Sequence, residues 1–157
     1  MAGPAAVKTL ALEHCRRVND GDLVGLLALY APSVVFEDPV GSGVRTGLAA
    51  LRAHAGQAIG AGVRELPGTP VGAVGGRHAA VPITGLLPYV PGSPLVAALG
   101  PHRPPADPAA TLLRMDYVMV VRAGAGGLLE DMRSYWDPAD IVLVDAATAP
   151  GGAGRGR

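Results

Sequence analysis

The sequence predicts an α+β domain in which three N-terminal helices pack on one face of a curved, mostly antiparallel sheet. Segments with apolar residues at helical spacing dominate the chain up to residue 60, and segments with strand-like patterns follow from residue 63 onward. Helices and strands that are segregated along the chain in this way are typical of α+β domains. The 157 residues fit one domain, which we expect to span residues 1–145, with a disordered tail at 146–157.

The three predicted helices have start and stop signals. The first runs from Pro4 to Val18 and is closed by the polar Asn19-Asp20-Gly21. The second runs from Leu23 to Tyr30 and begins after Asp22, whose side chain can cap it. The third runs from Thr46 to Gly60, with its apolar residues again at helical spacing.

The histidines of these helices are expected in different surroundings. His14 lies on the apolar stripe of the first helix and so points toward the core, where a packed histidine is more common than a catalytic one. Cys15 beside it is interpreted as a small buried hydrophobe. His54 and Arg52 fall off the apolar stripe of the third helix, and we expect both on a solvated face.

The second half of the chain is predicted to form most of the sheet. Pro82 should place part of its strand at an edge or a bulge, because proline cannot donate a ladder hydrogen bond. The proline-rich segment 88–108 has apolar residues that favour a lid over a solvated linker, with a helical turn at 95–99. The extended segments are residues 63–66, 71–74, 79–87, 111–122 and 128–136.

Composition and charge argue against several classes of function. The 13 basic residues balance the 13 acidic ones, so nothing indicates binding to nucleic acid or to an anionic membrane. A single cysteine without a histidine cluster predicts no zinc site, and we expect no metal or cofactor. The first residues lack the pattern of a signal peptide, and no apolar run is long enough to span a bilayer. We therefore expect a cytoplasmic protein that binds a small neutral molecule.

The stretch 34–43 holds the first candidate catalytic residue. Alternation places Val34, Phe36 and Asp38 on one face of a strand, so the carboxylate follows two apolar residues toward a dry environment. Burial penalises the charged form of such a group unless something stabilises it. Pro39 favours extended geometry at Asp38, and the glycines that follow let the chain turn away. This arrangement favours Asp38 as a catalytic base held at a strand end.

Two further carboxylates are candidates. Glu65 lies in a short strand, where alternation does not say which face is inward and an exposed glutamate is the simpler interpretation. Asp116 and Arg114 share a face of an otherwise apolar strand, where a structural ion pair and a role in the site are equally compatible with the pattern. Two carboxylates in one apolar pocket supply one proton donor and one acceptor. Epoxide opening and proton transfer beside a carbonyl both need such a pair.

Several motifs resemble the ketosteroid isomerase-like branch of the NTF2-like, SnoaL-like superfamily. They are Asn19-Asp20-Gly21-Asp22-Leu23, Tyr30-Ala31-Pro32, Phe36-Glu37-Asp38-Pro39-Val40-Gly41 and Thr46-Gly47. The resemblance implies a cone-shaped α+β barrel in which Asp38 is the proton-shuttling base. Asp116 resembles the second, protonated aspartate of those isomerases. His14 stands where they carry an oxyanion-hole tyrosine, and this departure argues against a steroid enone as the substrate.

Other segments resemble the epoxide hydrolases/cyclases of polyether ionophore biosynthesis. They are residues 11–19, the Asp38-Pro39-Val40-Gly41 motif, Leu51-Arg52-Ala53-His54, Glu65, the Pro88–Pro108 insertion and Ser134-Tyr135-Trp136. This resemblance implies a deep apolar cavity for a polyepoxide polyketide and often a homodimer. It also implies that Asp38 activates the attacking hydroxyl and that Glu65 is the acid.

The identity of the acid and the type of reaction are left open at this level. Arg114-Met115-Asp116 resembles the Arg-x-Asp of limonene-type epoxide hydrolases, which keeps Asp116 as an alternative acid. Ser134 stands about where those enzymes place another aspartate, so cyclisation is favoured over hydrolysis. A pyran synthase, a ketosteroid-type isomerase and a non-catalytic ligand-binding module are the rival hypotheses. The expected substrate-binding residues are His14, Tyr30, Phe36, Arg114, Tyr117 and Trp136.

Overall fold

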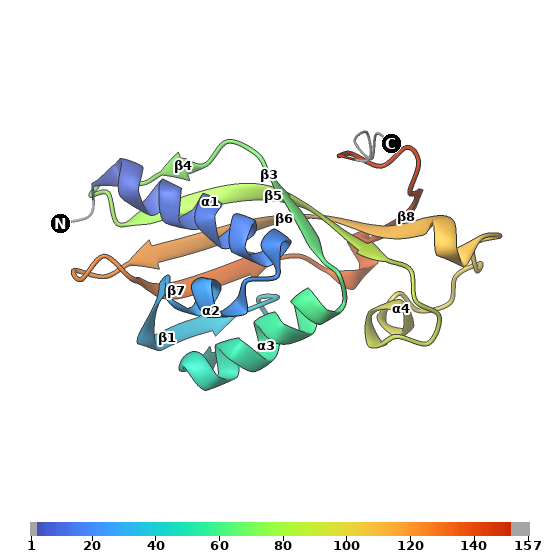
Figure 1. The fold of residues 1–157 in the computed structure, drawn as a ribbon, viewed down its shortest axis with the longest axis horizontal. Coiled ribbons are helices and arrows are strands. Elements are labelled where there is room, and N and C mark those ends of the chain that lie inside the picture. The colour runs from blue at the N-terminus through green and yellow to red at the C-terminus, as the bar shows by residue number, and fades with distance from the viewer. Residues whose placement is uncertain (1–2, 152–157) are drawn as a thin grey trace.

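The computed structural model describes residues 3–151 and places its three N-terminal helices on one side of a single sheet. Figure 1 shows α1 (Pro4–Asp20), α2 (Leu23–Leu27) and α3 (Leu48–Gly60) together over one face of the sheet, and α4 (Pro94–Ala98) beyond its end. The predicted α+β class, with three N-terminal helices on a curved sheet, is confirmed. Within these described residues, no helix combines the length and the apolar character needed to cross a membrane.

The sheet has eight strands in the order β2-β1-β7-β6-β5-β3, with β4 beside β5 and β8 beside β6. Every pair is antiparallel except β1 with β7. The strands at the two ends of this order, β2 and β3, are not paired with each other in the described part of the chain, so the sheet is open. The strands are β1 (Tyr30–Glu37), β2 (Arg45–Thr46), β3 (Arg64–Pro67), β4 (Val71–Gly72), β5 (His78–Pro88), β6 (Thr111–Ala123), β7 (Leu129–Tyr135) and β8 (Val142–Asp145).

The second helix is shorter than the sequence predicts. It ends at Leu27, and Tyr30 begins β1 instead of closing the helix. The chain joins the sheet directly after this helix, because the Leu29 carbonyl accepts from the Leu129 amide at the start of β7 at 2.9 Å. The strands β2 and β8 are too short to show a pattern of their own, and each is defined by its antiparallel partner.

Pro82 lies inside the long strand β5 without breaking it. Its carbonyl oxygen accepts a hydrogen bond from the Gly68 amide at 2.7 Å, so its nitrogen faces the same side. On that side β3 pairs with residues 83–86 and β4 with residues 79–80. The Pro82 nitrogen, which cannot donate, therefore faces the gap between β3 and β4. No hydrogen bond of the strand pairing is lost there.

Two apolar clusters fill the space under the helices and at the far end of the sheet. The larger one joins α1, α2 and α3 to the sheet and includes the fully buried Tyr30 and Phe36. The smaller one consists of Leu87, Tyr89, Val96, Leu113 and Met115, so α4 packs on the end of the long hairpin β5–β6.

The chain continues past β8 with backbone contacts to the domain. The Ala146 amide donates to the Ala110 carbonyl at 2.8 Å, and Ala149 is buried. These residues belong to the segment 146–157, for which the sequence predicts a disordered tail. The rest of that segment, 152–157, lies outside the described residues.

Candidate active site

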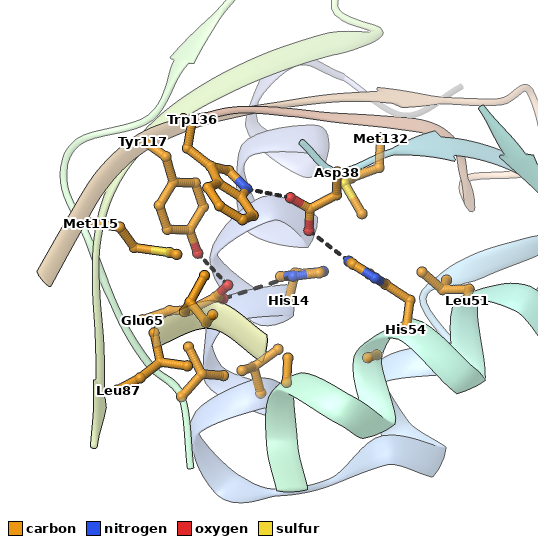
Figure 2. Close-up of a pocket in the computed structure, with 15 residues that line it drawn as sticks. His14, Asp38, Leu51, His54, Glu65, Leu87, Met115, Tyr117, Met132 and Trp136 are labelled. Atoms are coloured by element: carbon orange, nitrogen blue, oxygen red, sulfur yellow. Dashed lines mark hydrogen bonds and ion pairs between the residues drawn. The ribbon is translucent and has the colours of Figure 1, made fainter. Parts of the chain in front are cut away.

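A small cavity lies between the helices and the sheet, and both Asp38 and Glu65 border it. Its volume is about 160 Å³. Figure 2 shows the two carboxyl groups on different sides of the cavity, with His14 and His54 nearby. Most of the remaining wall is apolar and comes from α1, α3, α4 and the sheet, including Val18, Leu51, Leu87, Leu95, Met115 and Met132.

Asp38 is held at both of its carboxylate oxygens. Oδ1 accepts from Trp136 Nε1 at 2.6 Å, and Oδ2 lies 2.8 Å from His54 Nε2. Burial by itself raises the pKa of Asp38, but the hydrogen bonds from His54 and Trp136 outweigh it, so the net pKa lies below the ordinary 3.8. Asp38 is therefore a carboxylate near neutral pH, and it can accept a proton.

The turn after Asp38 is fixed by Glu37. Its Oε2 accepts from the amides of Gly41 at 3.2 Å and Gly43 at 3.1 Å, and both glycines have positive φ. Its Oε1 accepts from Arg133 on the neighbouring strand β7 at 3.3 Å. The Asp38 carboxylate, which follows β1, thus lies on a loop that these hydrogen bonds hold in place. The Asp38–Pro39 peptide bond in this loop is cis.

His54 contacts Asp38, and the expectation of a solvated His54 is therefore wrong. Arg45 donates to His54 Nδ1 at 3.3 Å. An arginine can only donate, so Nδ1 accepts and the ring proton lies on Nε2, facing Asp38. Phe36 packs against the His54 ring, with their centroids 5.6 Å apart. The only sequence signal for this role was the place of His54 in the Leu51-Arg52-Ala53-His54 motif.

Replacing His54 with phenylalanine tests this contact without reference to any reaction. The variant keeps an aromatic ring against Phe36 but removes one donor, so the pKa of Asp38 should rise and the protein should lose about 1–3 kcal/mol of stability near neutral pH. A group with a lowered folded-state pKa stabilises the protein above its unfolded pKa and loses that effect as the pH falls.

The stability difference between wild type and this variant should therefore shrink as the pH falls through the folded-state pKa of Asp38, which lies below 3.8. Denaturant unfolding across pH and carbon NMR titration of Asp38 measure both effects. His78→Phe at an exposed histidine of β5 is the control. An unchanged Asp38 titration in His54→Phe would contradict the proposed coupling.

Glu65 is buried on the inner face of β3. Tyr117 donates to its Oε1 at 2.5 Å, whereas Oε2 has no hydrogen-bond partner among the described residues. Gly85 lies opposite Glu65 in the strand pairing, and a Cβ there would come within 3.0 Å of the Tyr117 ring. The missing side chain thus makes room for Tyr117 to reach Glu65. The free Oε2 is the atom that can exchange a proton with a ligand.

The backbone of Glu65 is clamped to α1. The side chain of Asn19 donates to the Glu65 carbonyl at 2.7 Å and accepts from the Glu65 amide at 2.7 Å. These two bonds fix the register of β3 against the helix and hence the direction of the Glu65 side chain. Alternation along the short strand could not reveal this, because Asn19 is 46 residues away in the sequence.

His14 and Tyr30 form a pair behind the carboxyl of Glu65. The Tyr30 hydroxyl lies 2.6 Å from His14 Nδ1 and has no other hydrogen-bond partner among the described residues. Burial holds the pKa of Tyr30 well above its ordinary value. Tyr30 therefore donates to Nδ1, which leaves the His14 proton on Nε2, 3.8 Å from Glu65 Oε2. The same burial raises the pKa of the Cys15 thiol, so Cys15 is not a nucleophile.

Asp116 and Arg114 do not reach the cavity, and their predicted place in the pocket requires correction. They share a face of β6 as the sequence indicates, but it is the outer face, and the Asp116 side chain is 63% exposed. Met115 and Tyr117 occupy the inner face. The Thr84 hydroxyl and Arg114 hold the pKa of Asp116 below its ordinary value, so it is a surface carboxylate.

The other expected substrate-binding residues divide into two groups. His14, Tyr117 and Trp136 line the cavity. Tyr30 and Phe36 lie one layer behind it, fully buried, where they hold His14 and His54. Within residues 3–151 no group of three His, Cys, Asp or Glu side chains is placed to hold a metal ion.

Comparison with known proteins gives matches over most of the chain. Residues 11–132 match the SnoaL-like domain family. The chain is 51% identical over 142 residues to the epoxide hydrolase LasB of Streptomyces lasalocidi. The matched region covers 89% of this chain and 50% of LasB. This chain thus spans about half the length of that relative.

Two further proteins match along nearly their whole length. The steroid Δ-isomerase of Nocardioides simplex is 30% identical over 143 residues, which is 90% of this chain and 98% of the isomerase. The solved structure of SalBIII, described as an epoxide hydrolase/cyclase-like enzyme with a role in pyran ring formation in the polyether salinomycin, superposes with a TM-score of 0.72. The two chains are 26% identical, and the match covers 87% of this chain and 95% of the SalBIII chain.

Proposed function

The chain belongs to the SnoaL-like domain family, and on that premise we propose that it is an epoxide-opening cyclase that forms cyclic ethers from a polyepoxide polyketide. The observation that carries the proposal is the pairing of two different carboxyl groups across one apolar cavity. Asp38 is fully hydrogen-bonded and ionised, and Glu65 has one free oxygen. The identity to LasB and the likeness to SalBIII support the same chemistry.

In the proposed reaction Asp38 is the base and Glu65 is the acid. Asp38 takes the proton of a substrate hydroxyl while the hydroxyl oxygen bonds to an epoxide carbon. The bond between that carbon and the epoxide oxygen breaks, and Glu65 Oε2 gives its proton to the departing oxygen. The product is an isomer of the substrate, and exchange with solvent returns each carboxyl group to its starting state.

Neighbouring residues prepare the two carboxyl groups for these roles. His54 and Trp136 occupy one lone pair of each Asp38 oxygen and aim the others at the cavity. Tyr117 donates to Glu65 Oε1, and the Nε2–H of His14 lies close to Oε2, so both can stabilise the carboxylate that remains after proton transfer. Holding one hydroxyl next to one epoxide in a small cavity supplies a near-attack arrangement.

An isotope experiment distinguishes cyclisation from hydrolysis. A linear hydroxy-epoxide is incubated with the protein in water enriched in oxygen-18, and the product is analysed by mass spectrometry. Cyclisation gives a cyclic ether with no label, because the nucleophile is the substrate's own hydroxyl. Hydrolysis gives a triol with one labelled oxygen, and this outcome would overturn the cyclase assignment while retaining epoxide opening.

An isomerising or pyran-forming reaction in the same cavity is the second candidate. The match to steroid Δ-isomerase along nearly its whole length favours it. It predicts that a second aspartate, Asp116, is needed and that Glu65 is not.

We expect the opposite for Asp116→Asn, which should keep the turnover of the hydroxy-epoxide close to wild type because the side chain is exposed outside the cavity. Steady-state assays of Asp116→Asn and Glu65→Gln, each on the hydroxy-epoxide and on a 5-en-3-one steroid, test this expectation. Loss of turnover in folded Asp116→Asn protein would favour the second candidate.

The homodimer, the cytoplasmic location and the absence of a cofactor remain predictions. Sedimentation equilibrium of the purified chain tests the first of them. Turnover by protein dialysed against a chelator tests the last, and an activity that needed added metal would contradict it.

A further inference from the structure

A second hollow continues the candidate active site along α3 to the proline-rich segment after β5. Four residues, His54, Ala58, Leu87 and Leu95, border both the inner cavity and this hollow, so the two are contiguous. We name the hollow the tail groove. One wall is the C-terminal part of α3, and the other is the chain from Pro88 to Leu95.

The two spaces differ in size and suit different parts of a ligand. The inner cavity, at about 160 Å³, is below the ~300–1,000 Å³ of sites that enclose a drug-sized molecule. It has room for a reacting hydroxyl and one epoxide, and not for a whole polyether chain. The tail groove has a volume of about 590 Å³ and opens to solvent. The remainder of a long substrate must leave the inner cavity, and the tail groove is continuous with it.

The lining of the tail groove is uncharged. Its walls are alanine, proline, leucine and valine side chains, and no aspartate, glutamate, lysine or arginine is among the residues that border it. Val90 on one wall is 52% exposed, an apolar side chain that a ligand would cover. Gln57 and Ser93 are the polar groups beside His54, and each can hydrogen-bond an ether or hydroxyl oxygen. This lining fits an uncharged alkyl or polyether chain.

We propose that the tail groove binds the unreacted part of the linear substrate, while its reacting hydroxyl and epoxide lie between Asp38 and Glu65. The inference rests on the proposed function and adds a role for the 88–108 insertion. The insertion supplies a wall for the substrate chain, and Leu95 of α4 marks the boundary between tail and reaction centre.

A series of substrates with graded tails tests the groove. Hydroxy-epoxides that end in methyl, butyl or octyl groups are turned over by wild-type protein, and KM is expected to fall about fourfold for each methylene that becomes buried. Ala61→Phe fills the solvent end of the groove, where the backbone at residue 61 is in the ordinary right-handed helical region. This variant should lose the dependence of KM on tail length. Ala53→Phe, exposed on the same helix and outside both spaces, should keep it.

A binding measurement separates this inference from the proposed reaction. Unreactive tetrahydrofuran alcohols with the same methyl, butyl and octyl tails are titrated by calorimetry into wild type, Ala61→Phe and Ala53→Phe. Tighter binding with tail length in wild type and Ala53→Phe, and not in Ala61→Phe, supports the groove even if no epoxide is opened. Turnover without any effect of tail length would overturn the groove and leave the cyclase proposal standing.

Two further outcomes would also decide against the groove. If Ala61→Phe keeps the wild-type dependence on tail length, the chain binds elsewhere. If sedimentation shows a dimer in wild type that dissociates in Ala61→Phe, a second copy of the chain covers this surface. Val90→Phe on the opposite wall repeats the test should Ala61→Phe fail to fold.

Discussion

The Asp38→Asn variant is expected to fold and to turn over a hydroxy-epoxide about 10²–10⁴-fold more slowly than wild type, the usual contribution of a positioned general base. Asparagine keeps the shape of the side chain, and its oxygen can still accept from Trp136, whose Nε1 lies 2.6 Å from Asp38 Oδ1. The amide cannot take the proton of the attacking hydroxyl. Product chromatography measures kcat, and thermal unfolding checks the fold.

The control for this variant is Asp131→Asn. Asp131 is a carboxylate on the neighbouring strand β7, where it accepts from Arg133 at 3.0 Å and does not border the cavity. It tests whether a lost aspartate charge near the same strand is enough to slow the reaction. Near-normal turnover by folded Asp38→Asn, or an equal loss in Asp131→Asn, would remove Asp38 from the role of base.

Glu65→Gln is expected to give the second largest loss, on the order of 10²–10³-fold in kcat, because the amide has no acidic proton to give to the departing oxygen. The supporting contacts survive the change. Tyr117 can still donate to the side-chain oxygen, and the clamp to Asn19 involves only the backbone of residue 65. A defect in this variant therefore reports on proton transfer more than on position.

The choice of substrate separates the acid from the base. An electron-withdrawing group beside the departing oxygen makes the alkoxide a better leaving group, so assistance by an acid matters less. The loss in Glu65→Gln should shrink on such a substrate, whereas the loss in Asp38→Asn should not. If both variants lose the same factor on both substrates, Glu65 is not the acid.

The surroundings of Asp38 were largely predictable from the sequence. Val34, Phe36 and Asp38 alternate along one strand, and this local pattern is enough to place the carboxylate beside the core. Val34 and Phe36 are fully buried, and the chain turns at Gly41 and Gly43 as the sequence suggests. The hydrogen bonds to its two oxygens were not predictable, because His54 and Trp136 come from α3 and from the segment after β7.

Asp116 and Glu65 show what local sequence patterns cannot predict. The sequence correctly indicates that Asp116 and Arg114 share a face of β6, but it does not say that this face is the outer one. The sequence does not say which face of β3 the Glu65 side chain occupies. The pairing of Glu65 with Gly85 of β5 and the bond between the Glu65 backbone and Asn19 place it on the inner face. Strand periodicity predicts which side chains share a face of the strand. Only the packing of the sheet against the helices shows which of the two faces is the inner one.

The α+β class and the place of Asp38 at the end of an apolar strand could be predicted from the sequence, because both depend on residues close together in the chain. The packing of sheet and helices is what places Glu65, and not Asp116, across the cavity from Asp38, and what brings His54 into contact with the Asp38 carboxylate. Those contacts join residues 16 to 98 positions apart. They depend on strand register and helix packing, which no local pattern specifies.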